Sequence, residues 1–438
     1  MKQAIKRRDF LRRSVTAGAG FMVLPSGILR AGNSPNEKLN VAVIGVGGRG
    51  AANLNGVKRE NIVALCDIDA NRLAAAAKRF PKAKVYADWR KCLEQKDIDA
   101  VVCSTTDHTH AFVNVWAMNR GKHVYCEKPL ANSVYEARVV RETYLKNRDK
   151  LATQMGTQIH ATDNFRRVVE LIKAGAIGDV QECRVWCSRR PKGGSYLPAA
   201  GGVPKHINWD LWLGPSQSHA FNPGYVHGCL KWNRFWDFGS GQIGDMGSHM
   251  LDLPYWALDL RFPTSCKAEG TPVSTDTCPE WMNVTWDHPA TPERPALKIH
   301  WYDGGKKPGM PAKVFNRDEM FKGMLFKGTK GWLLADYGFR ILQLRGDMTH
   351  YDSPTPEQLI PKSPGHHMEW ITGCKTGKPT LCNFDYSGAL IEHNLLALVA
   401  YRTGQKLDWD AKSLRATNCA EADQFIKKTY RDGWVLNG

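Results

Sequence analysis

The chain contains 438 residues, of which 42% are hydrophobic and 24% are charged, and its formal net charge is +17 at pH 7. This length suits two or three domains with sizeable cores, and no apolar run approaches the ~18 residues that a membrane-spanning helix needs. Basic residues along the body of the chain are interleaved with acids, which is typical of a solvated surface rather than of a nucleic-acid groove. We therefore expect no nucleic-acid partner.

Residues 1–32 have the pattern of an export signal. The basic stretch KRRDFLRR precedes the apolar segment SVTAGAGFMVLPSGIL and the small pair Ala31-Gly32, which is the order of a signal peptide. Its RRxFL core is similar to a twin-arginine signal. An amphipathic helix is the alternative, but Gly18, Gly20 and Pro25 are poor helix formers. We expect the twin-arginine machinery to export the folded protein to the periplasm or another extracytoplasmic location, with no stable membrane span after signal removal.

A glycine-rich turn follows the first strand of the predicted fold. Residues 41–44 form a short apolar run typical of a buried parallel strand, and the next six residues, GVGGRG, have the spacing G-x-G-x-x-G. The first glycine permits a tight bend, the second lets a pyrophosphate approach, and the third lets the following helix pack closely on the strand. The predicted cofactor contacts in this turn are Gly45, Gly47, Gly48, Arg49 and Gly50.

An acidic residue ends the second apolar run, NIVALCDID. Asp67 lies 17 residues after Gly50, where a carboxylate can accept hydrogen bonds from both ribose hydroxyls and repel a 2′-phosphate. This favours NAD over NADP as the cofactor, although Arg72 is close enough in the sequence to complicate the choice.

Strands and helices alternate up to about residue 155, which predicts an α/β fold with a doubly wound parallel sheet. Ligands of such sheets bind at the carboxyl ends of the strands. The residues predicted at these ends are Asp67, Thr105, Thr106, His108, His110, Glu127 and Lys128. We expect no metal in the turn, because neighbouring side chains there diverge, and the twelve singly spaced cysteines are typical of buried free thiols.

Two further motifs carry a family resemblance. They are CEKPL at 126–130 and GSGQIGDMGSHMLDLPYWAL at 239–258. With the glycine-rich turn, they resemble the glucose–fructose oxidoreductase/inositol dehydrogenase/MocA (Gfo/Idh/MocA) family. The resemblance implies a nucleotide-binding domain at 33–155 and a C-terminal α/β domain at 156–438 for substrate binding and oligomerisation. This second domain should contain a large, open, mostly antiparallel sheet, and the chain should form a homo-oligomer.

The family resemblance also implies a catalytic set of Lys128, Asp245 and His249. The Lys128 ammonium can bind a substrate hydroxyl and stabilise the alkoxide as hydride leaves. Asp245 and His249 are four residues apart and share one face if their segment is helical. His249 would take the hydroxyl proton while Asp245 orients the substrate. A structural Asp–His pair near a helix cap is the alternative.

A stretch rich in glycine, proline and aromatic residues follows residue 188 and is too long for a simple connector. Aromatic faces stack on sugar rings, so this stretch indicates a small-molecule carbohydrate substrate. The substrate contacts that we predict from it are His206, Trp209, Tyr225 and His227. Ordinary packing of the aromatic residues is the alternative.

The expected activity is hydride transfer between a sugar or glycoside CH–OH group and NAD(P). An exported enzyme meets no soluble NAD pool, so we expect a tightly bound cofactor that is regenerated within each cycle. A redox-neutral, NAD-dependent glycoside hydrolase working through a transient keto-sugar is the alternative, and it needs a further base. A non-catalytic nucleotide sensor is the third hypothesis, against which the presence of Lys128, Asp245 and His249 speaks.

Overall fold

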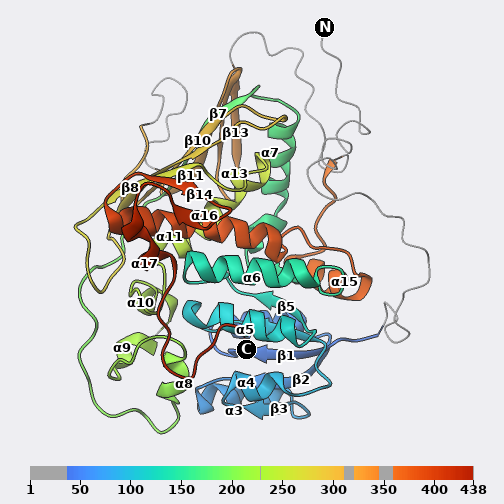
Figure 1. Ribbon diagram of the computed structural model, residues 1–438. Coiled ribbons are helices and arrows are strands. Elements are labelled where there is room, and N and C mark those ends of the chain that lie inside the picture. The colour runs from blue at the N-terminus through green and yellow to red at the C-terminus, as the bar shows by residue number, and fades with distance from the viewer. Residues whose placement is uncertain (1–36, 227, 310–319, 345–358, 438) are drawn as a thin grey trace.

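The computed structural model describes residues 37–226, 228–309, 320–344 and 359–437, so the predicted signal at 1–32 lies outside the described residues. Two sheets, one below the other in Figure 1, are separated by long helices. No helix in the described ranges combines the length and the apolar character that a membrane crossing requires.

The first sheet has six parallel strands in the order β3-β2-β1-β4-β5-β6, which confirms the predicted doubly wound fold. The chain order reverses between β1 and β4, and such a switch point opens a ligand crevice at the carboxyl ends of the strands. The strands are β1 (Asn40–Ile44), β2 (Asn61–Cys66), β3 (Lys84–Tyr86), β4 (Ala100–Cys103), β5 (His123–Cys126) and β6 (Thr153–Met155). The connecting helices are α2 (Arg49–Val57), α3 (Ala70–Arg79), α4 (Trp89–Leu93), α5 (Asp107–Asn119) and α6 (Val134–Asn147).

Local sequence explains where these helices begin. The side chain of Asp69 accepts hydrogen bonds from the amides of Asn71 and Arg72 at the start of α3, and Ser133 accepts from the amide of Glu136 at the start of α6. Both residues satisfy amides that have no partner within the helix. The loops at the carboxyl edge of the sheet are therefore fixed at their helical ends.

The second sheet has nine strands in the order β13-β12-β11-β7-β10-β9-β8-β14-β15. Among the described strands of this second sheet, only β7 and β10 pair in parallel, so the predicted mostly antiparallel sheet is confirmed. Its strands are β7 (Val180–Cys187), β8 (Ser265–Gly270), β9 (Met282–His288), β10 (Leu297–Asp303), β11 (Lys322–Gly328), β12 (Gly331–Ala335), β13 (Arg340–Leu344), β14 (Leu407–Asp410) and β15 (Arg415–Ala416).

The remaining elements are mostly short helices around the two sheets. They are η1 (Gln158–Ala161), α7 (Asp163–Lys173), α8 (Trp209–Leu213), α9 (Pro223–Val226), α10 (Cys229–Trp232), α11 (Gly241–Asp245), α12 (Gly247–Met250), α13 (Asp252–Ala257), α15 (His366–Thr376), α16 (Phe384–Thr403), η2 (Ala420–Ala422) and α17 (Asp423–Ile426). The sequence EADQFIKKTYRDGW predicts one C-terminal helix, but the helical part ends at Ile426. The tail instead packs the Tyr430 and Trp434 rings edge-on against Phe112 of α5.

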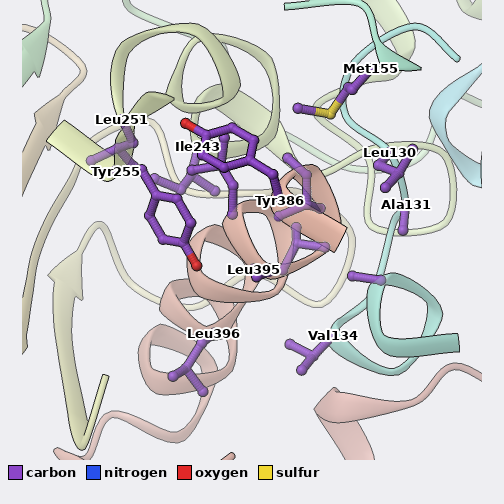
Figure 2. Close-up of a cluster of buried hydrophobic side chains, with 14 of the residues drawn as sticks. Leu130, Ala131, Val134, Met155, Ile243, Leu251, Tyr255, Tyr386, Leu395 and Leu396 are labelled. Carbon is purple, nitrogen blue, oxygen red and sulfur yellow. The ribbon is translucent and has the colours of Figure 1, made fainter. Parts of the chain in front are cut away.

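Two long helices join the halves of the molecule. Helix α16 runs along α6 between the two sheets (Figure 1). Figure 2 shows the apolar contact that results, in which side chains from α16 and the β5–α6 connection face those of α11 to α13; the labelled residues are Leu130, Ala131, Val134, Met155, Ile243, Leu251, Tyr255, Tyr386, Leu395 and Leu396. This cluster holds the segment after β5 against the segment that contains Asp245 and His249.

Helix α15 belongs to the C-terminal part of the sequence but packs on the first sheet. Trp370, Ile371 and Cys374 share a buried cluster with Val41 and Val102 of the parallel strands. The predicted division at 155/156 coincides with the end of β6 at Met155, yet the second part of the chain supplies core residues to the first.

Candidate functional site

The glycine-rich turn has the geometry that a pyrophosphate requires. Gly45 has φ 82°, and a Cβ there would lie 2.5 Å from the Ser104 carbonyl oxygen; a Cβ on Gly50 would lie 1.8 Å from the Gly45 oxygen. No atom lies within 4 Å of the corresponding position on Gly48. Among the described residues, the amides of Gly47 and Gly48 donate no hydrogen bond to other protein groups. The start of α2 therefore presents free donors to an anion, and these residues fit a dinucleotide.

Asp67 closes the side of this turn. Its carboxylate accepts hydrogen bonds from the amides of Val46 at 2.8 Å and of Asp69 at 3.0 Å. Burial raises the pKa of Asp67 above its usual value, against the lowering effect of these amides and of Arg72. Arg72 packs over Gly47, pairs with Asp69 at 3.3 Å and keeps half of its side chain exposed. A carboxylate and a guanidinium thus lie together beside the predicted ribose site.

Lys128 and Asp245 form a buried ion pair at the carboxyl edge of the sheet. Lys128 follows β5, with a cis peptide bond to Pro129, and its Nζ donates to Oδ1 of Asp245. Arg189, which comes just after β7, donates to the second carboxylate oxygen at 2.5 Å. Burial opposes the charge on Lys128, but Asp245 outweighs it and raises the lysine pKa above its usual value. Lys128 therefore stays protonated, so it can donate to an oxygen but cannot serve as the base.

Asp245 and His249 lie on successive short helices, α11 and α12, rather than within one long helix. A second break follows between α12, which ends at Met250, and α13, which begins at Asp252; it matches Pro254, which has no amide hydrogen to donate to the Met250 carbonyl. Gly244 of α11 lies close to the side chain of Ser240 at the start of the same helix. A Cβ on Gly244 would lie 1.8 Å from Oγ of Ser240. The charge of each of the two predicted catalytic residues affects the pKa of the other.

His249 is a neutral base in this setting. Burial and then the charge of Lys128 lower the pKa of His249 to about 3, so its imidazole is uncharged near neutral pH. Its Nδ1 atom is buried without a hydrogen-bond partner among the described residues. A buried unpaired nitrogen is costly; the other ring nitrogen, Nε2, is not shielded in this way, so it is the atom that a substrate oxygen could reach. The site therefore combines a fixed cationic donor with a neutral proton acceptor.

Glu127 connects the strand end to the nucleotide turn. Its carboxylate accepts from Nε of Arg49 at 3.0 Å and from Nδ2 of Asn53 at 2.9 Å. Asn53 in turn contacts His367, whose Nε2 lies 3.0 Å from the asparagine Oδ1. Arg49 keeps 44% of its side chain exposed. Of the two predicted cofactor contacts here, Arg49 remains accessible at the turn, whereas Glu127 is buried and holds Arg49 in place.

The histidines predicted at the end of β4 point into the protein. The ring nitrogens of His108 lie 2.9 Å from the Trp212 carbonyl and 3.3 Å from that of Phe238, and burial lowers its pKa to about 4. Those of His110 lie 2.6 Å from the Pro129 carbonyl and 3.1 Å from that of Thr105. Both imidazoles lie against backbone carbonyls and so support the turn; their contact with the cofactor stays a prediction.

Thr105 and Thr106 keep partial exposure at the edge of the sheet, as cofactor contacts require. Thr105 accepts a hydrogen bond from the Thr109 hydroxyl at 2.6 Å. Their position directly after β4, beside the glycine-rich turn, keeps both available to a nucleotide.

The four predicted substrate residues differ in their surroundings. Tyr225 is fully buried, and its hydroxyl accepts from the Leu197 amide at 2.6 Å, so it packs inside the protein in this structure. Trp209 is stacked on Trp212 with ring centroids 4.6 Å apart, within an aromatic cluster. His206 is partly exposed, and its carbonyl accepts from the Ala70 amide at 2.8 Å, next to the ribose site. The prediction for His227 lies outside the described residues.

Three further side chains belong to this site. Arg189 donates a hydrogen bond to Asp245. Asp107 and Cys229 lie close enough to Lys128 and Asp245 for the charges of that pair to affect their pKa values. Of these three, only Asp107 could be found from the sequence, by its position directly after the loop that follows β4. Arg189 and Cys229 reach the site only through tertiary folding.

Two profiles of one family match the chain. One, described as an oxidoreductase family with an NAD-binding Rossmann fold, matches residues 39–155; the other, described as the C-terminal alpha/beta domain of an oxidoreductase family, matches 191–291. The chain belongs to the Gfo/Idh/MocA oxidoreductase family. Inositol 2-dehydrogenase of Salmonella typhimurium is 33% identical over 145 residues, covering 32% of this chain and 43% of the relative. Levoglucosan dehydrogenase of Pseudarthrobacter phenanthrenivorans is 28% identical over 187 residues, covering 41% and 38%. The match thus spans less than half of each relative.

Solved structures of the family share the fold. Levoglucosan dehydrogenase in complex with NADH and levoglucosan aligns with a TM-score of 0.58 at 17% identity, covering 85% of this chain and 99% of that one. The WlbA dehydrogenase of Bordetella pertussis in complex with NADH and UDP-GlcNAcA aligns with a TM-score of 0.61 at 13% identity, covering 85% and 99%. The similarity at these identities is one of fold.

Proposed function

We propose that this family member transfers hydride between a CH–OH group of a sugar or glycoside and a tightly held NAD. One observation carries the proposal: Lys128, Asp245 and the neutral His249 meet at the carboxyl edge of the nucleotide sheet. When bound, NAD supplies the hydride acceptor or donor. The Lys128 ammonium would hold the reacting oxygen, the His249 imidazole would take its proton, and the pair of cations around Asp245 would fix the carboxylate.

Contacts between the long stretch after residue 188 and the nucleotide-binding sheet support retention of the cofactor. Residues 206–208 lie across the turn after β2, because the Ala70 amide donates to the His206 carbonyl at 2.8 Å and the Asn208 amide to the Ile68 carbonyl at 2.9 Å. The ring of His108, at the start of α5, contacts the Trp212 carbonyl, which lies in the same stretch after residue 188 (called the insertion below). This insertion borders the ribose side of the site, where it would slow the departure of a bound dinucleotide.

We also propose that the protein is exported folded through a twin-arginine signal, as residues 1–32 indicate, and acts as a homo-oligomer outside the cytoplasm. Loading NAD before export would supply the cofactor where no free pool exists. The mass of the purified protein in solution, measured by light scattering, tests the oligomer. N-terminal sequencing of the protein from the periplasmic fraction tests the signal.

The function is tested with the full chain purified without added nucleotide. We expect about one nicotinamide nucleotide per subunit after denaturation, and a change in absorbance at 340 nm when the protein meets its sugar. The panel should contain myo-inositol, levoglucosan and methyl and aryl glycosides. A protein that carries no nucleotide, binds neither NAD nor NADH and reduces no cofactor with the whole panel would sink the proposal.

A redox-neutral glycoside hydrolase is the second candidate. The buried carboxyl of Asp107, on which the charge of Lys128 acts, favours it, because this route needs a base besides His249. Cleavage of an aryl glycoside with no net NADH would favour the hydrolase, whereas steady NADH production from free sugar and added NAD would exclude it.

The carboxylate of Asp67 predicts a preference for NADH over NADPH. For protein freed of nucleotide, we expect Asp67→Ser to improve the Kd for NADPH relative to NADH by about tenfold or more, because a carboxylate that repels the 2′-phosphate is removed. Fluorescence titration of both nucleotides measures the ratio. Adding Arg72→Ala should reverse the gain, since Arg72 is the cation beside the same turn. A ratio unchanged by Asp67→Ser would contradict the assignment.

A further inference from the structure

Asp107 is a nearly buried carboxyl group whose oxygens have no protein partner. It is the first residue of α5 and directly follows the loop at the end of β4. Its exposed fraction is 4%. Neither oxygen takes part in a hydrogen bond or ion pair with any residue in the described ranges, and neither is completely shielded from solvent. The small exposed area of this residue therefore includes its carboxyl oxygens.

The charges around this carboxyl are those of the catalytic site. Lys128 and Asp245 act on it from the segment after β5 and from α11, His110 from its own helix, and Lys428 from the C-terminal segment. Cys229 of α10 and Cys278 also lie within its reach. Burial, the largest influence, raises the pKa of Asp107 to about 7. A base of that strength is much better suited to removing a carbon-bound proton than an ordinary carboxylate.

We propose that Asp107 is a second proton-transfer residue of this site, which removes the proton from the carbon next to the one that is oxidised. The inference rests on the proposed function and deepens it. Lys128 holds the reacting oxygen, so the neighbouring carbon of a bound sugar would lie toward the second carboxyl at the same edge. Two carboxylates act on the charge of Lys128: Asp245, which is already paired with Lys128 and Arg189, and Asp107, which is not paired.

The step balances with the groups present. Oxidation of the CH–OH group moves a hydride to the nicotinamide and a proton to His249, leaving a ketone. The ketone acidifies the adjacent C–H bond; that bond breaks, its proton passes to the Asp107 carboxylate, and its electron pair enters the enolate whose oxygen Lys128 stabilises. Return of a proton from Asp107 to the same carbon reverses the step. With a glycoside, the electron pair of the enolate can instead expel the neighbouring glycosidic oxygen.

Deuterium exchange tests this role. The full chain with its bound nucleotide is incubated in D₂O with the panel named above, and deuterium at the carbon beside the oxidised one is measured by NMR and mass spectrometry. Reduction of the bound nicotinamide is followed in parallel at 340 nm. We expect Asp107→Asn to lower the exchange rate by about 100-fold or more and by a larger factor than the rate of nicotinamide reduction. Asp259→Asn, the same change at a side chain that is 58% exposed and pairs with Lys173, should keep the ratio of the two rates within about threefold.

The pH profile separates a proton-transfer role from a structural one. Exchange should rise with pH through about 7 as the Asp107 carboxylate forms, and this rise should be absent in Asp107→Asn. The variant should melt no lower than the wild type at pH 8, because it removes a carboxyl that ionises at a cost in the folded state. Nicotinamide reduction without exchange in the wild type, or exchange that survives in Asp107→Asn, would overturn the inference. No reduction with any panel compound would overturn the proposed function itself.

Discussion

Replacing Lys128 with methionine should lower the rate of hydride transfer by about 10³-fold, the loss expected when one preorganised donor to a developing oxyanion is removed. Methionine keeps much of the side-chain volume but donates no hydrogen bond. The raised pKa of Lys128 keeps it cationic beside Asp245, so the lost interaction is a charged one. Single-turnover reduction of the bound nicotinamide, followed at 340 nm, measures the change directly.

Two variants make this result specific. Lys128→Arg keeps the charge but replaces a compact ammonium with a planar group, and it should recover only part of the rate. Lys298→Met removes a lysine of the second sheet whose side chain is 58% exposed, and it should react like the wild type. The nucleotide content of all three variants should stay the same, since Lys128 acts on the substrate oxygen. A Lys128→Met rate within tenfold of the wild type would contradict the assigned role.

The nucleotide half of the site could be predicted because its chemistry is local. The turn from Gly45 to Gly50 and the acidic end of β2 lie within one strand–helix–strand unit, and spacing alone indicates which backbone group approaches which. The structure then places Asp67 against the Val46 amide, 21 residues earlier in the chain. Here the local pattern and the tertiary contact agree.

The substrate half could not be predicted to the same degree, because its contacts join distant segments. Arg189 reaches Asp245 across 56 residues, and nothing in its own neighbourhood marks it as a partner. Some aromatic residues of the insertion are the opposite case, in which the sequence pattern indicates a substrate contact but the fold buries the side chain. Tyr225 matches the pattern of a sugar platform, but its hydroxyl bonds the backbone of Leu197 and its ring lies in a closed cluster. Composition shows that aromatic residues are present, whereas packing decides which of them remain accessible.

The protonation states were equally hidden from the sequence. His249 and His110 occur in similar polar motifs, yet burial and the charge of Lys128 lower the pKa of His249 to about 3. For His110, burial also favours the neutral form, but Cys103 and Asp107 outweigh it and raise the pKa above its usual value. One imidazole is therefore a neutral acceptor and the other a donor to backbone carbonyls. The distinction depends on neighbours that only the fold brings together.

Replacing Asp252 with alanine should lower the free energy of unfolding by about 1–3 kcal/mol, the usual cost of leaving a buried hydrogen-bonding group without its partner. Asp252 is fully buried at the start of α13, where it lies 3.0 Å from Nδ1 of His160 and accepts from the Tyr386 hydroxyl at 2.7 Å. The other ring nitrogen of His160, Nε2, is buried without a partner among the described residues. The variant would leave Nδ1 of His160 without its partner too, whereas the Tyr386 hydroxyl could still donate to the backbone carbonyl of residue 252.

The position of Asp252 makes this variant informative about the site as well as about stability. It joins η1 and α16 to the short helices that carry Asp245 and His249, so urea unfolding should be paired with single-turnover kinetics. Asp252→Asn can still accept from Tyr386 and should lose less stability than alanine. The matched control is Asp210→Ala, which breaks a pair with Arg431 at a side chain that is 74% exposed; its cost should stay below about 1 kcal/mol. If both alanine variants cost equally little, the buried pair does not hold the catalytic helices, and the apolar cluster between α16 and α11–α13 must fix their position alone.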